Sequence, residues 1–160
     1  MYWERPQFIR VGYEILYRCK NQLKMDAVIS FFQNQQNLKY WLLLVASLRL
    51  LSVYLGYIQP SELQKNVFPP GAKQYTGLVG RTFAVWTSVT CAITIQTAYN
   101  LNNGPLVRIG IFTFLVANTY FALEYLVFKS VSLKSITLPF IFATSSSLWL
   151  YLVALPNAKF

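Results

Sequence analysis

Four long apolar stretches alternate with short polar breaks along the chain. Each stretch is close to the length at which a helix crosses a bilayer, about 20 residues. Tyrosine or tryptophan flanks the first stretch at both ends, which is typical of residues at a membrane interface. The pattern therefore predicts an all-α integral membrane four-helix bundle, with spans at about 40–58, 78–99, 106–128 and 136–155.

The predicted four-span domain covers residues 38–155, between an N-terminal extension at 1–37 and a short tail at 156–160. Apolar residues from Phe8 to Leu23 recur at helical spacing, which is typical of a helix lying on a membrane surface. A loosely ordered tail is an equally good interpretation of the extension. A third possibility is that the natural protein starts at Met25, in which case residues 1–24 lie outside it.

The polar breaks predict how the spans are connected. Residues 59–75 contain three prolines and Gly71 and so predict a loop, after which Thr76 is a suitable helix N-cap. The short turn at 100–105 predicts that the second and third spans form a tight antiparallel hairpin. Four spans put both termini on one side of the membrane. We expect that side to be cytoplasmic, because it carries more of the lysines and arginines.

Charged residues within the predicted spans are rare, and three of them need partners. Arg49 lies at the centre of the first span, where an unpaired arginine costs roughly 2.5 to 3.5 kcal/mol on the insertion scale. Arg81 and Glu124 lie at similar depths, counted at about 1.5 Å per residue. We therefore expect Arg81 and Glu124 to form the main ion pair, with Arg49 deeper, against the Tyr120 hydroxyl or backbone carbonyls.

Hydroxyl side chains line one face of the second predicted span. Thr87, Thr90, Thr94 and Thr97 recur at steps of three and four residues, which places them on the same side of a helix. Small hydroxyl-bearing residues let membrane helices approach closely, so this face is predicted to pack against another helix. A face that lines a ligand pocket is the alternative.

The composition fits a protein embedded in lipid. Hydrophobic residues make up 55% of the chain and charged residues 12%, whereas soluble domains carry about 25% charged residues. Lysine and arginine outnumber aspartate and glutamate 14 to 5, but the basic residues are spread along the chain and form no stripe. This distribution favours contact with anionic lipid head groups and predicts no nucleic-acid partner.

The sequence offers little catalytic chemistry. It contains no histidine and two cysteines, which removes the commonest metal ligand and the usual general base. We therefore predict no catalytic residues, no metal, no cofactor and no enzymatic activity. A cofactor-free isomerase that uses Glu124 as its acid/base group is one alternative. A small channel or carrier is another, although the chain has no internal repeat to support it.

Four sequence blocks, in register along the chain, resemble the ergosterol biosynthetic protein twenty-eight family. The blocks are SVYLGY in the first span, GRTFAVWT opening the second, the turn NLNNGPL, and LEYLVF ending the third. The resemblance covers roughly residues 38–155. Its most specific residues are Arg81, Thr82, Phe83, Trp86, Thr87, Asn103, Leu106 and Glu124. The chain departs from the family at Tyr120, where many relatives carry a histidine, and it has none at the turn position Asn102.

The resemblance implies a non-catalytic scaffold in the endoplasmic reticulum membrane. Such a protein would tether the enzymes of sterol C-4 demethylation, namely the methyl oxidase, the C-3 dehydrogenase/decarboxylase and the 3-keto reductase. Holding successive enzymes together raises the effective concentration of each intermediate. Self-association is compatible with this role. The candidate structural or interface residues are Arg49, Arg81, Trp86, Thr87, Thr90, Thr94, Asn103, Tyr120 and Glu124.

The second interpretation is a cofactor-free sterol-binding or sterol-isomerising membrane protein that uses Glu124. The two interpretations predict different interiors. A scaffold pairs its polar groups with one another, whereas a binding protein contains a cavity of several hundred Å³ with Glu124 exposed in it.

Overall fold

The structure is a computed structural model that describes residues 26, 29–70 and 75–159. Residues 1–34 and 35–160 form separate units. All four predicted spans belong to the second unit, and the account below concerns that unit alone. The amphipathic segment expected between Phe8 and Leu23 lies outside the described residues.

The second unit is built from helices. In chain order they are α2 (Gln35–Ile58), α3 (Pro60–Val67), α4 (Gly77–Tyr99), α5 (Gly104–Leu126), α6 (Leu133–Trp149), a π-helical turn (Leu150–Ala154) and α7 (Leu155–Asn157). By length and composition, α2, α4, α5 and the continuous run Leu133–Asn157 could each cross a membrane. The predicted all-α fold with four spans is therefore confirmed.

The loop expected at 59–75 was predicted wrongly in its first half, where Pro60–Val67 form the helix α3. The prolines were interpreted as helix breakers, but Pro60 occupies the first helical turn, where its fixed φ favours the helix and its missing N–H is not needed. Lys65 donates to Glu62 at 2.9 Å one turn earlier, and Leu63 is buried. The helix also packs against α2 and α4.

The helices also extend beyond the apolar stretches that predicted them. α2 begins at Gln35 and α6 at Leu133, because polar residues beside a span can continue its backbone hydrogen bonding. As a result, Pro139 lies inside α6 and not in its first turn. α5 ends earlier than expected, at Leu126.

Side-chain caps fix where two spans start. The Thr76 hydroxyl accepts from the Val79 N–H at 3.4 Å, which confirms the predicted N-cap of α4. The Asn103 side chain accepts from the Leu106 N–H at 3.0 Å and caps α5 in the same way. Asn103, one of the residues that carry the family resemblance, therefore has a local structural role in the turn.

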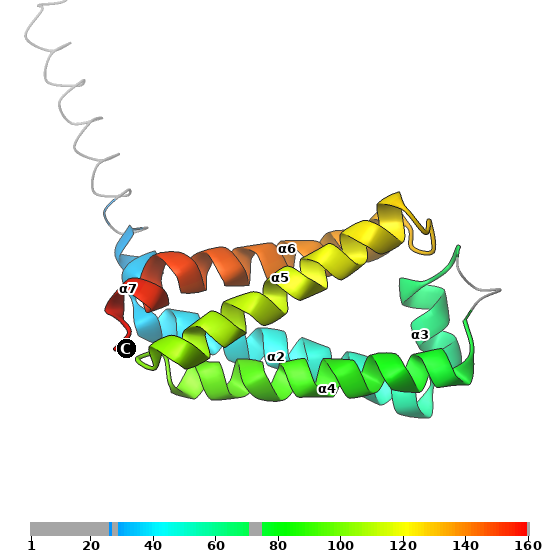
Figure 1. Ribbon diagram of the computed structural model, residues 1–160, viewed down its shortest axis with the longest axis horizontal. Helices are drawn as coiled ribbons and strands as arrows, with labels where there is room; N and C mark the ends of the chain where they lie inside the picture. Colours follow the sequence, from blue (N-terminus) through cyan, green and yellow to red (C-terminus); the bar gives the residue numbers. More distant parts are fainter. Residues whose placement is uncertain (1–25, 27–28, 71–74, 160) are drawn as a thin grey trace, which may run out of the picture. The chain divides into compact units, whose positions relative to one another are not determined.

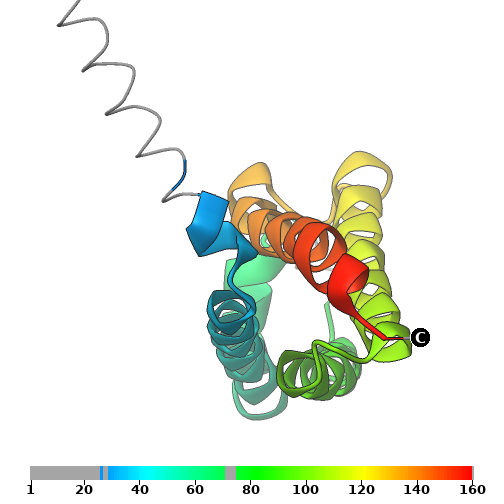
Figure 2. The same ribbon diagram turned by 90° about the vertical axis from the view of Figure 1, so that its left-hand side faces the viewer.

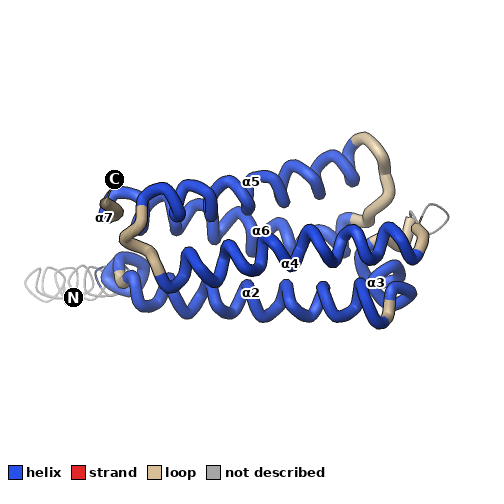
Figure 3. The backbone as a smooth tube through the Cα atoms, turned by 60° about the horizontal axis from the view of Figure 1, so that its bottom comes forward, coloured by secondary structure: helices blue, strands red, loops and turns tan. Residues whose placement is uncertain are grey.

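The long helices are arranged as two antiparallel pairs, α2 with α4 and α5 with α6 (Figure 1). The pairs lie close together at the end that carries α7 and the α4–α5 turn, and they diverge toward the end that carries α3. Viewed along their axes, the four spans surround a common centre (Figure 2). The connections at the two ends of the spans are seen in Figure 3.

The predicted tight hairpin of the second and third spans is only partly correct, because α4 packs more extensively on α2 than on α5. Next to the turn, α4 and α5 are close: a Cβ atom at Gly110 would lie 2.9 Å from the Thr97 Oγ1. Farther from the turn, the rings of Phe83 and Tyr120 lie between the two helices, with their centroids 6.5 Å apart. Small residues thus bring the helices together at one end, and aromatic residues separate them at the other.

Small side chains also explain how closely α2 approaches α4. A Cβ atom at Gly56 would lie 2.8 Å from both the Ala84 Cβ and the Gly80 carbonyl oxygen. Such close approach is typical of membrane helices that pack through small residues. Across the bundle, the Trp41 Nε1 donates to the Ser146 Oγ at 2.9 Å, which links α2 to α6.

The buried apolar residues form two clusters. The larger cluster fills the end where the helix pairs meet and includes Leu38, Leu42, Ala98, Val107, Phe114 and Leu150. The smaller one, which we call the aromatic cluster, lies at the diverging end. It consists of Phe68, Phe121, Val131 and Ile136, with Val67, Tyr75, Phe83 and Tyr120 packed against them. Phe68, from the chain after α3, therefore packs with residues of α5 and α6 at the wide end of the bundle.

Candidate functional site

A cavity of about 290 Å³ lies between the two helix pairs, bounded by side chains from all four spans and by Val67. Most of the lining is apolar. The polar lining residues are Arg49, Ser52, Thr87, Thr90 and Tyr120. Arg49 is the one charged residue among them, so it sets the polarity of the cavity.

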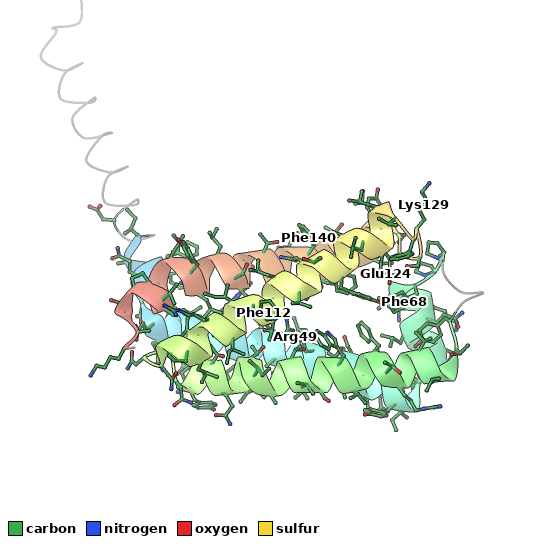
Figure 4. All side chains as sticks on the ribbon, in the orientation of Figure 1. Arg49, Phe68, Phe112, Glu124, Lys129 and Phe140 are labelled. Atoms are coloured by element: carbon green, nitrogen blue, oxygen red, sulfur yellow. The ribbon has the colours of Figure 1, made fainter. Side chains whose placement is uncertain are left out.

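The Arg49 guanidinium joins three helices near the middle of the bundle (Figure 4). Its Nη1 donates to the Thr94 Oγ1 at 3.0 Å and to the Thr90 carbonyl oxygen at 3.3 Å, both on α4. Its Cζ lies 4.4 Å from the centroid of the buried Phe114 ring on α5. The expectation that backbone carbonyls serve Arg49 is confirmed, whereas the Tyr120 hydroxyl is not its partner.

Arg49 keeps hydrogen-bonding capacity that the described residues do not use. A guanidinium has five N–H donors, and the two bonds that the described side chains and backbone provide both come from Nη1. Both acceptors are uncharged. No described residue accepts a hydrogen bond from the Nε or Nη2 donor. Because Arg49 lines the cavity, a molecule bound there would lie beside an arginine with unused donors.

The threonine face of α4 is divided between helix packing and the lining of the cavity. Thr87, Thr90, Thr94 and Thr97 are all buried, and each hydroxyl donates to a carbonyl of its own helix. Thr94 and Thr97 lie at contacts between helices, whereas Thr87 and Thr90 line the cavity. The packing face and the pocket face are therefore two parts of the same stripe.

The predicted ion pair between Arg81 and Glu124 is wrong. Arg81 is exposed, and the ion pair within the described residues is the one inside α3. The Glu124 carboxylate accepts a hydrogen bond from the Ser130 Oγ, and the Glu124 carbonyl accepts from the Ser130 N–H at 3.0 Å. Depth along the helices did not predict this partner, because the chain turns back at Lys129, which has a φ of 53°. This turn brings the Ser130 hydroxyl to the Glu124 carboxylate.

Glu124 therefore belongs to the end of α5 and not to the cavity. Glu124 is absent from the cavity lining, although its side chain interacts with that of Tyr120, one turn earlier on the same helix, which is part of the lining. In Figure 4, Glu124 is labelled toward the diverging end of the bundle, away from Arg49. Of the two features expected of a binding protein, the structure contains a cavity but does not expose Glu124 in it.

Trp86, the remaining candidate, lines the cavity and is also 49% exposed. Sequence reasoning missed Phe114 and the contribution of α6, from which Pro139 and Phe142 line the cavity. Only the expectation of an intramembrane arginine could have pointed to an aromatic partner such as Phe114. The described residues contain no group of three or more metal-binding side chains.

The fold and this site define a small four-span helical membrane protein with an apolar cavity between its helix pairs that an arginine helps to line. The sequence model described as "Erg28 like protein" matches residues 38–148. The chain belongs to this family, as the sequence blocks predicted, and membership implies a role in ergosterol biosynthesis.

Named relatives agree with the family. The chain is 36% identical to "Ergosterol biosynthetic protein 28" of Arabidopsis thaliana over 115 residues, which cover 72% of this chain and 88% of that protein. It is 32% identical to the Candida albicans protein of the same name, over 76% of this chain and 88% of that protein. The Saccharomyces cerevisiae protein of that name is 29% identical, over 69% and 76%. No solved structure matches the chain.

Proposed function

We propose that this protein is a non-catalytic membrane scaffold of sterol biosynthesis. It tethers the enzymes of sterol C-4 demethylation, namely the methyl oxidase, the C-3 dehydrogenase/decarboxylase and the 3-keto reductase. The proposal combines the family, whose members are named for ergosterol biosynthesis, with the resemblance of the sequence blocks. A tether acts by raising the effective concentration of each intermediate at the next enzyme.

The observation that carries the non-catalytic part of the proposal is the position of Glu124. An isomerase would need its acid/base carboxyl within about 3 Å of the proton that it moves. Glu124 instead accepts from Ser130 at the end of α5 and does not line the cavity. Glu124, the carboxylate within the predicted spans, thus bonds to the turn that follows α5.

The outer faces of the spans suit a protein that binds other membrane proteins. Large apolar side chains are exposed on every span; they include Phe112 on α5 at 64% and Phe140 on α6 at 41%, both labelled in Figure 4. In a bilayer these faces meet lipid or the helices of partners, since association there depends on side-chain packing. The exposed faces of α5 and α6 are our proposed docking surfaces for the tethered enzymes.

We further propose that the protein lies in the endoplasmic reticulum membrane with both termini on the cytoplasmic side. An even number of spans supports a common side for the termini. The side can be tested with a short tag inserted after Lys159. Intact and permeabilised microsomes that contain the tagged protein are treated with protease, and cleavage of the tag is compared. Cleavage in intact microsomes supports the cytoplasmic side, whereas protection contradicts it.

The tether is tested by purifying the tagged protein in mild detergent and identifying the copurifying proteins by mass spectrometry. A four-span protein of the same membrane serves as the control bait. We expect the methyl oxidase and the dehydrogenase to be recovered, and sterols that retain C-4 substituents to accumulate in cells that lack the protein. Recovery of neither enzyme, or turnover of a sterol by the purified protein alone, would overturn the proposal.

A further inference from the structure

The cavity between the helix pairs is not fully enclosed, and three of its lining residues are exposed on the outside of the bundle. They are Leu51 on α2, Leu138 on α6 and Trp86 on α4, which are 56%, 62% and 49% exposed. All three lie within helices that are long and apolar enough to cross a membrane, so we expect the exposed part of each side chain to meet hydrocarbon. A molecule dissolved in the membrane can therefore enter the cavity sideways.

The size of the cavity suits part of a lipid. Its volume of about 290 Å³ is just below the range for small-molecule pockets, about 300 to 1,000 Å³. A molecule larger than the cavity can leave its remaining apolar part between the helix pairs or in the surrounding lipid. Apolar lining on all four spans favours an apolar body, and the lining residues Phe142 and Ala143 are among those that would contact it.

The polar end of that molecule is defined by Arg49. Arg49 lines the cavity, no described residue accepts from its Nε or Nη2 donor, and its two hydrogen-bond acceptors are neutral. An intramembrane arginine without a counter-charge is costly and usually marks a functional site. A carboxylate supplies both the missing charge and two acceptor oxygens that match the fork of a guanidinium.

Depth disfavours the head group of a bilayer phospholipid as the anion. Arg49 lies nine residues before the end of α2, which corresponds to roughly 13 Å at about 1.5 Å per residue. A phosphodiester at the interface would have to move far into the hydrocarbon layer with its second chain. A single carboxyl group attached directly to one apolar body can reach that depth more readily.

We propose that this cavity binds an apolar lipid with a single carboxylate, which accepts hydrogen bonds from Arg49. The apolar body is either a single acyl chain or a fused ring system. The inference does not depend on the tethering role, because it requires neither a partner enzyme nor turnover. A failed pull-down would leave it standing, and a failed binding experiment would leave the scaffold standing.

The test uses the purified full chain and two photoreactive probes, stearate and stearyl alcohol, each with a diazirine in its chain. Labelled residues are identified by mass spectrometry. We expect both probes to label cavity residues in a saturable way. The stearate probe should reach half-saturation at a concentration about tenfold or more below the one that the stearyl alcohol probe needs, because the carboxylate forms a charge-assisted hydrogen bond. Unlabelled oleate and cholesteryl hemisuccinate, as competitors, distinguish an acyl-chain source from a ring-system source.

The matched variants are Arg49→Gln and Arg81→Gln, since Arg81 is an exposed arginine outside the cavity. Arg49→Gln should remove the preference for stearate, and Arg81→Gln should retain it. Ala117→Leu, which fills the cavity from α5 and keeps Arg49, should weaken labelling by both probes and serves if Arg49→Gln does not assemble. Equal saturation by the two probes, loss of the preference in both arginine variants, or unchanged labelling in Ala117→Leu would overturn the proposal.

Discussion

The hydroxyl of Thr94 on α4 lies between Arg49 and the Thr90 carbonyl oxygen: it accepts from the Arg49 Nη1 at 3.0 Å and donates to that carbonyl at 2.7 Å. Thr94 is fully buried. One side chain thus holds a guanidinium from α2 against the backbone of α4. Because the two helices form the most extensive pair of the bundle, this bond is both a structural contact and the anchor of the charge in the cavity.

Replacing Thr94 with valine should destabilise the protein. Valine has nearly the same shape but no oxygen that could accept from the Arg49 Nη1. We therefore expect the free energy of unfolding to fall by about 1 kcal/mol. The measurement is the thermal unfolding midpoint in detergent. Thr82→Val is the matched control, because the exposed Thr82 hydroxyl bonds to the Leu78 carbonyl of its own helix. Equal midpoints for the two variants would contradict a role for Thr94 in holding Arg49.

Replacing Gly110 with alanine should separate α4 from α5 beside their turn. The new Cβ would lie 2.9 Å from the Thr97 Oγ1 and 3.1 Å from its methyl carbon, and such overpacking typically costs about 1 to 3 kcal/mol. Gly77→Ala is the control, since the nearest atom to its Cβ would be the Arg81 Nη1 at 3.5 Å.

A double variant tests whether this contact is the cause. Thr97→Ala removes the atoms that the Gly110 Cβ would meet, so the two substitutions together should be less damaging than the sum of the single ones. Additive losses, measured by the same unfolding midpoints, would show that the damage in Gly110→Ala arises elsewhere.

The partner of Glu124 can be tested with two thermodynamic cycles. Glu124→Gln combined with Arg81→Gln should give a coupling energy below about 0.5 kcal/mol, as expected for groups that do not interact. Glu124→Gln combined with Ser130→Ala should give a larger one, because the Ser130 hydroxyl donates to this carboxylate. A coupling to Arg81 that exceeds the coupling to Ser130 would restore the ion pair expected from the sequence.

Stability should fall in alkaline solution through Tyr75, which lies between α3 and α4. Burial raises the pKa of Tyr75 above its usual value, so the unfolded chain loses this proton at a lower pH than the folded chain. The contribution is fully present below about pH 10, the usual tyrosine pKa, and is lost as pH rises. Tyr75→Phe should therefore flatten the decline of the unfolding midpoint above that pH.

The same variant should also be tolerated at neutral pH. The Tyr75 hydroxyl is buried and has no hydrogen-bond partner among the described residues, so its removal leaves no acceptor unsatisfied. We expect the unfolding midpoint at pH 7 to be unchanged or higher. A clear decrease, or an alkaline decline as steep as that of the parent, would contradict this account of Tyr75.

The four spans and the family could be predicted from the sequence because both depend on local order along the chain. A run of about 20 apolar residues is a transmembrane helix wherever its neighbours lie. The Thr76 cap of α4 could be predicted for the same reason, since its bond is made within four residues. The face formed by Thr87, Thr90, Thr94 and Thr97 followed from helical periodicity.

Tertiary structure alone decided what those faces contact. Helical periodicity could not show what the Thr94 side chain contacts, because its partner Arg49 is 45 residues away in the chain. The divergence of α4 from α5 depended on glycine at one end and aromatic rings at the other. Glu124 found Ser130 because the chain reversed direction after α5. Sequence spacing gives the face and depth of a residue, whereas a partner is chosen by the packing of whole helices, and the cavity beside Arg49 is what that packing leaves unfilled.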